Sequence, residues 1–163
     1  MNFYITYGTA DFLQKIAKKH HLENLLYTVG KEQAALFHET EGETVFKAPH
    51  AYDVIYTKTK GELVQSGFVT LNHIPVKLES RALFESTFQK KTNMSEHQRG
   101  FQALRVLRPK KDEEVYLILT LWESEDLFQD FQESEAFFQP HEDTGSIFSR
   151  PAYLTSYHAV IDH

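Results

Sequence analysis

Apolar positions recur along the chain with the periods of short strands and helices. Near the start, Phe3, Ile5 and Tyr7 alternate with polar neighbours, which is typical of a half-buried strand. Thr9 then offers a cap for a helical pattern over Ala10–Lys19. The pattern next predicts two strands and a brief extended piece: Leu25–Val29, Ala34–Glu39 and Val45–Phe46. The segment Ala51–Tyr56 fits a helix and a strand equally well.

The second half shows a clearer alternation of strand and helix. Its predicted helices are Glu79–Lys91 and Glu125–Ser134, and Ser124 is a strong N-cap for the second one. Its predicted strands are Phe68–Val76, Phe101–Leu107, Val115–Trp122 and Ala152–Ile161. The order strand-helix-strand, strand-helix-strand predicts the split βαβ arrangement of the ferredoxin-like fold.

A polar stretch divides the two halves. Lys58–Gly67 contains two glycines and a serine among charged residues, so we expect the joint there. This predicts an α+β extension at residues 1–66 and a ferredoxin-like domain at residues 67–163. A ferredoxin-like sheet has helices on one face only, so the extension is expected to pack on the other face as a pseudo-second protomer.

Composition narrows the classes of function. The formal net charge is −6 and no basic run occurs, which argues against binding to nucleic acid. The chain has no cysteine, so disulfides and thiolate ligands are excluded. The N-terminal residues lack the features of a signal peptide, and no segment approaches the roughly 20 apolar residues of a membrane span. We therefore expect a cytoplasmic protein.

Asn72 is the first candidate for a functional side chain. Alternation along the strand Phe68–Val76 places it on one face with Phe68 and Ile74. An amide among apolar neighbours costs about 1–3 kcal/mol unless it is paired. Either the nearby backbone satisfies Asn72, or its amide is left to hydrogen-bond a ligand.

His141 and Phe131 are the other two candidates. His141 follows Pro140, where a helix must break, and neutral imidazole is a common ligand of iron. It can equally be an ordinary surface or capping histidine. Phe131 lies ten residues earlier and reaches the same pocket only if the chain bends between them. Otherwise it is simply part of the core.

Other kinds of site find little support. The remaining histidines show neither His-x-x-x-His nor His-x-His spacing, and structural zinc sites usually include cysteine as well. No glycine-rich phosphate loop and no Gly-x-Ser-x-Gly motif occurs, so nucleotide binding and serine hydrolysis are not indicated.

Several stretches together resemble a known family. Tyr116–Asp126, followed by Phe128, resembles the strand-to-helix signature of the antibiotic biosynthesis monooxygenase (ABM) superfamily, and is most similar to its Isd-type heme-degrading monooxygenases. Four further stretches resemble a subgroup with an N-terminal extension, the HmoB-like and TRAP proteins of Gram-positive bacteria: Tyr4–Leu13, His38–Phe46, Ala103–Pro109 and Ser146–Tyr153. The resemblance spans nearly the whole chain.

The resemblance implies a heme pocket that contains an asparagine, a tryptophan and a histidine. The asparagine falls on Asn72, and the histidine falls on His141, which would ligate the heme iron. The tryptophan falls on Phe131, so this chain departs from the pattern there, whereas Trp122 matches a separate structural tryptophan. A smaller ring at this position is expected to allow heme binding but to slow turnover or abolish it.

The function implied is oxidative opening of heme, with release of iron. It needs O2 and an external electron donor, such as a reductase. Two alternatives stay open: a heme-binding or TRAP-like regulatory protein without turnover, and a fold that serves only protein interaction. Since the extension would replace the second subunit of dimeric relatives, we expect a monomer.

Overall fold

The computed structural model describes residues 1–20, 25–47, 49–59, 67–91, 99–111, 115–133 and 147–160. The strands in these residues are β1 (Asn2–Gly8), β2 (Leu25–Val29), β3 (Ala34–Thr40), β4 (His50–Thr59), β5 (Phe68–Pro75), β6 (Phe101–Pro109), β7 (Val115–Trp122) and β8 (Tyr153–Ala159). The α-helices are α1 (Ala10–His20), α2 (Arg81–Lys91) and α3 (Glu125–Gln132), with a 3₁₀ turn at Leu78–Ser80 before α2. None of the described helices is long and apolar enough to cross a membrane.

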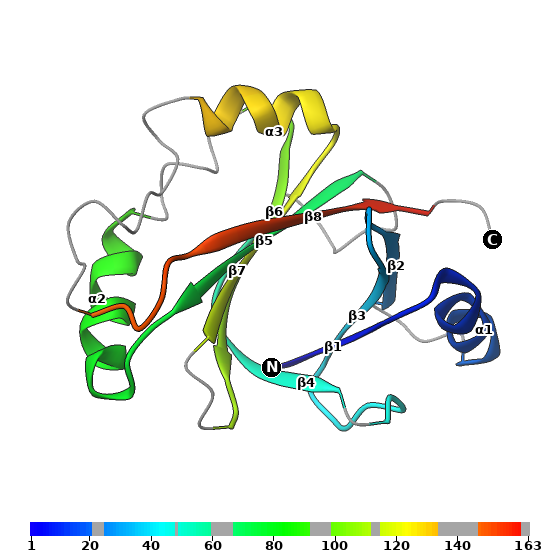
Figure 1. The fold of residues 1–163 in the computed structure, drawn as a ribbon, viewed down its shortest axis with the longest axis horizontal. Coiled ribbons are helices and arrows are strands. Elements are labelled where there is room, and N and C mark those ends of the chain that lie inside the picture. The colour runs from blue at the N-terminus through cyan, green and yellow to red at the C-terminus, as the bar shows by residue number, and fades with distance from the viewer. Residues whose placement is uncertain are drawn as a thin grey trace.

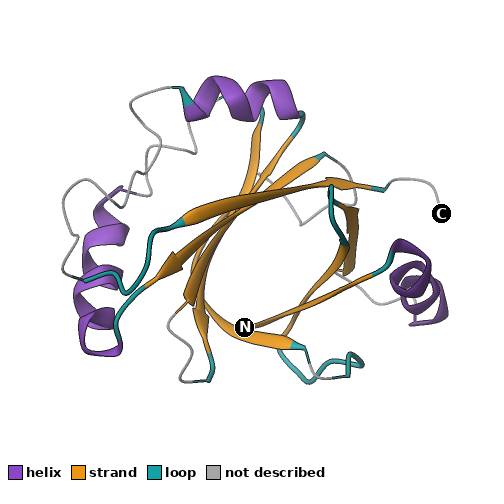
Figure 2. Ribbon diagram, viewed as in Figure 1, coloured by secondary structure: helices purple, strands orange, loops and turns teal. Residues whose placement is uncertain are grey.

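The strands close into one barrel in the order β1-β3-β2-β8-β5-β7-β6-β4, with β4 pairing back onto β1. Every neighbouring pair is antiparallel. Figure 1 shows the strands as a ring with the helices outside it, and Figure 2 shows that the helices occupy separate places around this ring. The fold is thus α+β and ferredoxin-like, as the sequence predicts.

The two halves of the chain use the same strand order. In the second half, the order β8-β5-β7-β6 places the fourth strand beside the first and the third between first and second. In the first half, β4-β1-β3-β2 repeats this order, with α1 after its first strand as α2 follows β5. The halves join edge to edge through β2–β8 and β4–β6. The first half therefore stands beside the second as a pseudo-symmetric partner within one chain.

Side-chain alternation separates the barrel interior from its outer layers. On β5, Val69 and Leu71 belong to the interior cluster, which also contains Phe3 and Phe37 of the first half. The face of the second-half sheet that lacks helices is thus covered by the first half. The outward residues of β5–β7 pack under α2 and α3, and a third cluster lies under α1.

Helix starts follow the local sequence. The Ser124 hydroxyl accepts a hydrogen bond from the Leu127 N–H at 3.3 Å, and the Thr9 hydroxyl accepts one from the Phe12 N–H at 3.3 Å. A side-chain oxygen at these positions satisfies an amide that the helix itself leaves unpaired. Both predicted caps are confirmed.

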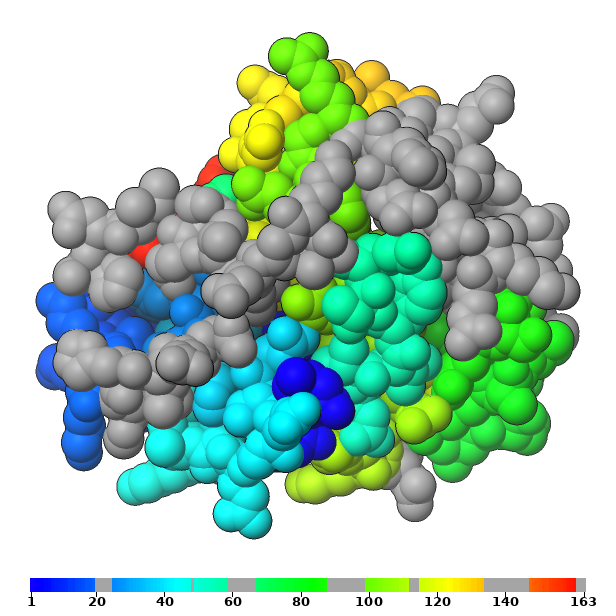
Figure 3. All heavy atoms as spheres, turned by 180° about the vertical axis from the view of Figure 1, so that it is seen from behind, coloured from blue at the N-terminus to red at the C-terminus, as the bar shows by residue number. Residues whose placement is uncertain are grey.

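A buried ion pair lies inside the barrel, near the end where β1 begins. Arg105 on β6 contacts both carboxylate oxygens of Glu39 on β3, with Nε–Oε2 at 2.5 Å and Nη2–Oε1 at 3.2 Å. Its Nη1 also donates to the Leu104 carbonyl at 3.1 Å. Only 5% and 9% of the two side chains is exposed. Near the same end, the Val54 N–H donates to the Met1 carbonyl at 3.0 Å, and the N-terminal residues reach the surface seen from behind (Figure 3).

Candidate functional site

Asn72 lies on the outer face of the second-half sheet, as alternation predicts. Its neighbours Phe68 and Ile74 on β5 belong to the layer under the helices, whereas Leu71 and His73 point to the other side. Across the strands, Asn72 is paired with Ile118 of β7 and with Leu154 of β8. Both partners are apolar, and Leu154 is 36% exposed. The Asn72 amide therefore stands between two apolar cross-strand partners.

The Asn72 amide is half-buried and makes no side-chain hydrogen bond to any described residue. By contrast, nearby polar side chains on this face are paired. The hydroxyls of Thr70 and Thr120 hydrogen-bond each other across β5 and β7, and the Trp122 Nε1–H donates to the Thr120 hydroxyl at 2.8 Å. Partly buried amide groups in proteins normally have hydrogen-bond partners. The unpaired Asn72 amide is therefore available to hydrogen-bond a ligand.

Phe131 lies on the same side of the sheet, on α3. It is buried, and its ring centroid is 5.0 Å from that of Trp122 with the planes tilted by 32°. Trp122 is itself fully buried and also contacts Phe101 and Phe128 edge-on. Trp122 thus anchors α3 to the sheet, and Phe131 belongs to the layer of aromatic rings around Trp122. Phe131 and Asn72 thus both lie on the helix-covered side of the second-half sheet.

His141 lies outside the described residues, together with Pro140 and the segment 134–146. The described chain resumes at Ile147, whose carbonyl accepts a hydrogen bond from the Lys77 N–H at 2.9 Å. Phe148 then bridges to Val76 just after β5. The role of His141 as an iron ligand therefore stays a prediction.

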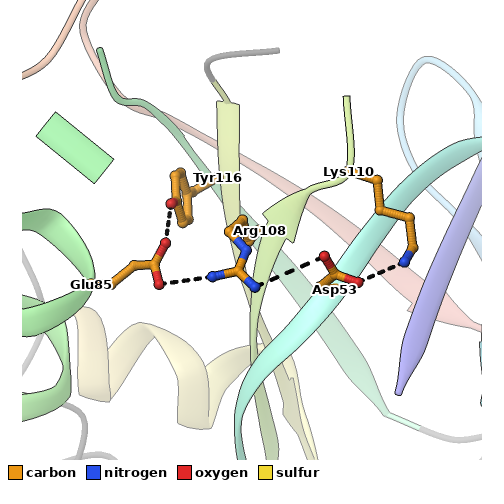
Figure 4. Close-up of polar contacts among 5 residues, drawn as sticks. All are labelled: Asp53, Glu85, Arg108, Lys110 and Tyr116. Atoms are coloured by element: carbon orange, nitrogen blue, oxygen red, sulfur yellow. Dashed lines mark hydrogen bonds and ion pairs between the residues drawn. The ribbon is translucent and has the colours of Figure 1, made fainter. Parts of the chain in front are cut away.

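A polar network that the sequence did not predict attaches α2 to the outer face of the second-half sheet (Figure 4). Glu85 of α2 accepts hydrogen bonds from the Tyr116 hydroxyl and from Arg108 Nη1, the latter at 3.1 Å. Arg108 also approaches Asp53, which pairs with Lys110 at 2.6 Å. Burial and the Glu85 hydrogen bond raise the pKa of Tyr116, so it remains a donor. These partners are 23 to 57 residues apart, and no local spacing indicates them.

His73 belongs to a second set of polar side chains, inside the barrel, which the sequence reasoning also missed. Its Nε2 lies 2.9 Å from the Thr155 hydroxyl, and its ring stacks on Tyr153 with centroids 4.4 Å apart. Burial, with a smaller contribution from His50, lowers the pKa of His73 from 6.5 to about 4. The folded protein therefore holds a neutral imidazole at this position.

This shifted pKa makes stability depend on pH. The unfolded chain binds a proton at His73 near pH 6.5, whereas the folded chain does so only near pH 4. The free energy of unfolding should therefore fall as pH drops through this window, by about 2–3 kcal/mol from His73 alone at pH 4.5. Urea unfolding at pH 7 and pH 4.5 checks this, since His73→Gln should lose that much less stability than the parent. Equal losses in both proteins would show that His73 does not titrate in this way.

The sequence is similar to one protein family and to proteins of two staphylococcal species. Residues 67–143 match the family described as antibiotic biosynthesis monooxygenase. The chain is 31% identical over 134 residues to the signal transduction protein TRAP of Staphylococcus aureus (strain MSSA476), which covers 82% of this chain and 78% of that protein. It is 26% identical over 137 residues to the TRAP protein of Staphylococcus epidermidis, covering 84% of this chain and 80% of that one.

Two solved structures show the same fold. One, described as a major regulator of staphylococcal pathogenesis, superposes with a TM-score of 0.89 at 26% identity and covers 99% of this chain and 100% of its own. The other, the heme-degrading enzyme LmHde of Listeria monocytogenes, superposes with a TM-score of 0.72 at 21% identity, over 98% of this chain and 100% of its own. At this identity the Listeria structure shows a shared fold.

Proposed function

Because the chain belongs to the antibiotic biosynthesis monooxygenase superfamily, together with the staphylococcal TRAP proteins, we propose that it binds heme and opens it oxidatively. One observation carries this proposal. The Asn72 amide has no hydrogen-bond partner among the described residues, and its two cross-strand partners on the outer sheet face, Ile118 and Leu154, are apolar. A free amide amid apolar side chains suits a flat, largely apolar ligand with a polar centre.

The residue types fit heme. Ile118 and Leu154, the cross-strand partners of Asn72, offer apolar contact to a macrocycle. Asn72 offers the hydrogen bond, and His141 offers an imidazole, the side chain that most often ligates heme iron. When bound, heme supplies the iron and porphyrin chemistry, with O2 and electrons from an external donor.

The roles that we assign to this chain's own residues are binding, orientation and exclusion of water. His141 would fix the position of the iron from one side. Asn72 would orient the polar centre by donating from its amide. The apolar surface of β5, β7 and β8 would keep water from the reacting ring, which strengthens each polar contact made there.

Absorbance titration with hemin tests binding. A shifted Soret band that saturates at one hemin per chain is expected, and Asn72→Leu should weaken this binding because the amide is lost. Asn2→Leu is a matched control, since its amide donates to the Glu41 and Gly42 carbonyls away from this face. The absence of any shifted band in the parent protein would exclude heme as the ligand.

Phe131→Trp should accelerate the oxidative degradation of bound heme. The buried Phe131 ring already lies 5.0 Å from Trp122, so the larger indole must extend away from it, and the family pattern has tryptophan here. The same crowding should lower stability by about 1–3 kcal/mol. The measurement is the rate of Soret decay with ascorbate in air. Phe128→Trp, on the same helix and 5.8 Å from Trp122, is the matched control. An unchanged or slower decay in Phe131→Trp would contradict the steric argument.

A second candidate function is heme binding or regulation without turnover. Phenylalanine at position 131 favours it, as do the names of the staphylococcal relatives. Ascorbate separates the two candidates, because a carrier keeps its Soret band and an enzyme loses it. A protein that serves only interaction with other proteins would show no band shift at all.

A further inference from the structure

A cavity of about 310 Å³ opens at the end of the barrel where β1 and β5 finish and β4 and β8 begin. Most of its described lining is aromatic: Tyr7, His50, Tyr52, His73, Tyr153 and Tyr157. None of its described lining residues is Asp, Glu, Lys or Arg. It is distinct from the outer face that carries Asn72, because successive residues of a strand point to opposite sides of the sheet.

Both halves of the chain build this cavity. Tyr7, His50 and Tyr52 come from the first half, and His73, Tyr153 and Tyr157 come from the second. β1 and β5, which have equivalent places in the two halves, lie on opposite sides of the ring. The cavity therefore sits where the pseudo-symmetric halves face each other.

Two hydroxyl groups in the wall have no hydrogen-bond partner in the described parts of the chain. The Tyr7 and Tyr157 hydroxyls make no hydrogen bond to any described residue. Burial, followed by the neighbouring tyrosines, raises the pKa of Tyr7, so this hydroxyl keeps its proton and can donate. His73 is held at one nitrogen by Thr155. Partnerless hydroxyls in a cavity wall are available to an oxygen acceptor on a ligand.

The aromatic rings that line the cavity give it flat walls. His73 and Tyr153 stack at 4.4 Å with an interplanar angle of 5°, and His50 meets Tyr7 edge-on at 5.4 Å. Tyr157 lies 6.5 Å from Tyr7, which places two hydroxyl-bearing rings near each other. Planar aromatic molecules pack well between such surfaces.

We propose that this cavity binds a small, uncharged aromatic molecule of one or two rings that carries a carbonyl or hydroxyl oxygen. An ionised ligand would lose its hydration and meet no opposite charge in the described wall, which is costly. The volume lies at the lower end of the range of ligand pockets, about 300–1,000 Å³, and so favours a small molecule over a porphyrin. The two Tyr hydroxyls would hold the oxygen, and the stacked rings would hold the plane.

A seam in the barrel wall adjoins the cavity. β2 pairs with β8 only at Thr28–Ala159 and Val29–His158. Beyond this point, the turn 30–33 faces Leu154–Tyr157 across a second cavity of about 360 Å³, which shares Gln33, Thr155 and Tyr157 with the first. Gly30 allows the turn to approach Tyr157 closely, because a Cβ at this position would lie only 2.8 Å from the Tyr157 ring.

Calorimetric titration with chromone, a neutral two-ring ketone, tests the proposal. Chromone should bind, naphthalene should bind more weakly because it has no oxygen, and 2-naphthoate should bind least because it is charged. Tyr7→Phe and Tyr157→Phe should each weaken chromone binding by about 3–10-fold, the worth of one neutral hydrogen bond. Tyr4→Phe is the matched control, since the Tyr4 hydroxyl donates to the Gly42 carbonyl outside the cavity.

A second readout uses the unmodified protein and does not depend on how the variants fold. Chromone should shift the imidazole C–H resonances of His50 and His73 in NMR spectra, and leave that of His158 in place. Prior saturation with hemin should not change the chromone affinity, because the two sites lie on opposite sides of the sheet. The proposal is overturned if chromone does not bind, if 2-naphthoate binds as tightly, or if the shifts lie elsewhere.

Discussion

Replacing Arg105 with methionine should lower the free energy of unfolding by about 3–5 kcal/mol, the usual cost of removing one partner of a buried ion pair. The substitution leaves the Glu39 carboxylate inside the barrel with no cationic partner among the described residues, and water cannot replace that partner because only 9% of the side chain is exposed. It also removes the donor to the Leu104 carbonyl. Urea unfolding at neutral pH measures the loss.

Two further variants show whether the cost comes from the stranded charge. The double variant Arg105→Met with Glu39→Leu should recover most of the stability, because apolar side chains of similar size often replace a buried pair without loss. Lys110→Met breaks the exposed pair with Asp53, where 34% and 39% of the side chains are exposed, and should cost at most about 1 kcal/mol. A loss below 1 kcal/mol in Arg105→Met would mean that Glu39 finds water or another partner.

His141→Ala should abolish the shifted Soret band. Loss of a residue that merely orients a metal ligand commonly costs 10–100-fold in affinity, so loss of the ligand itself should cost more than about 100-fold. Hemin titration by absorbance measures the effect, with thermal unfolding as a check that the variant folds.

His158→Ala is the control for this prediction. His158 is an exposed histidine of β8 whose Nε2 lies 3.6 Å from Glu125, near the start of α3. Its removal should leave the Soret band unchanged. If the band survives in His141→Ala and disappears in His158→Ala, the iron ligand has been assigned to the wrong histidine.

The second half of the fold could be predicted from local patterns because each of its elements carries its own signal. Alternation in β5 placed Asn72 on the face with Phe68 and Ile74, and the structure confirms this face. The ambiguous segment Ala51–Tyr56 is part of strand β4, and Tyr52 and Val54 face the barrel core. The predicted extended piece at Val45–Phe46 is not a strand, and Phe46 instead packs into the cluster under α1.

Closure of the barrel has no comparable local signal. It depends on pairs such as Asp53–Arg108 and Val29–His158, whose members are far apart in the chain. The same distance hides Arg105 and Glu39 from sequence reasoning, because each looks like an ordinary charged residue of a short strand until the barrel brings them together. The aromatic cavity is hidden for this reason as well, since its walls come from both halves.

Release of iron from heme tests the central proposal most directly. The protein is loaded with one equivalent of hemin and given ascorbate in air, with catalase present to remove free peroxide and an Fe(II)-specific chelator to report iron. We expect the Soret band to decay and chelated iron to rise in equal amounts, both slower in Asn72→Leu and neither without O2. A stable Soret band with no iron released, in protein that binds hemin, would contradict the account.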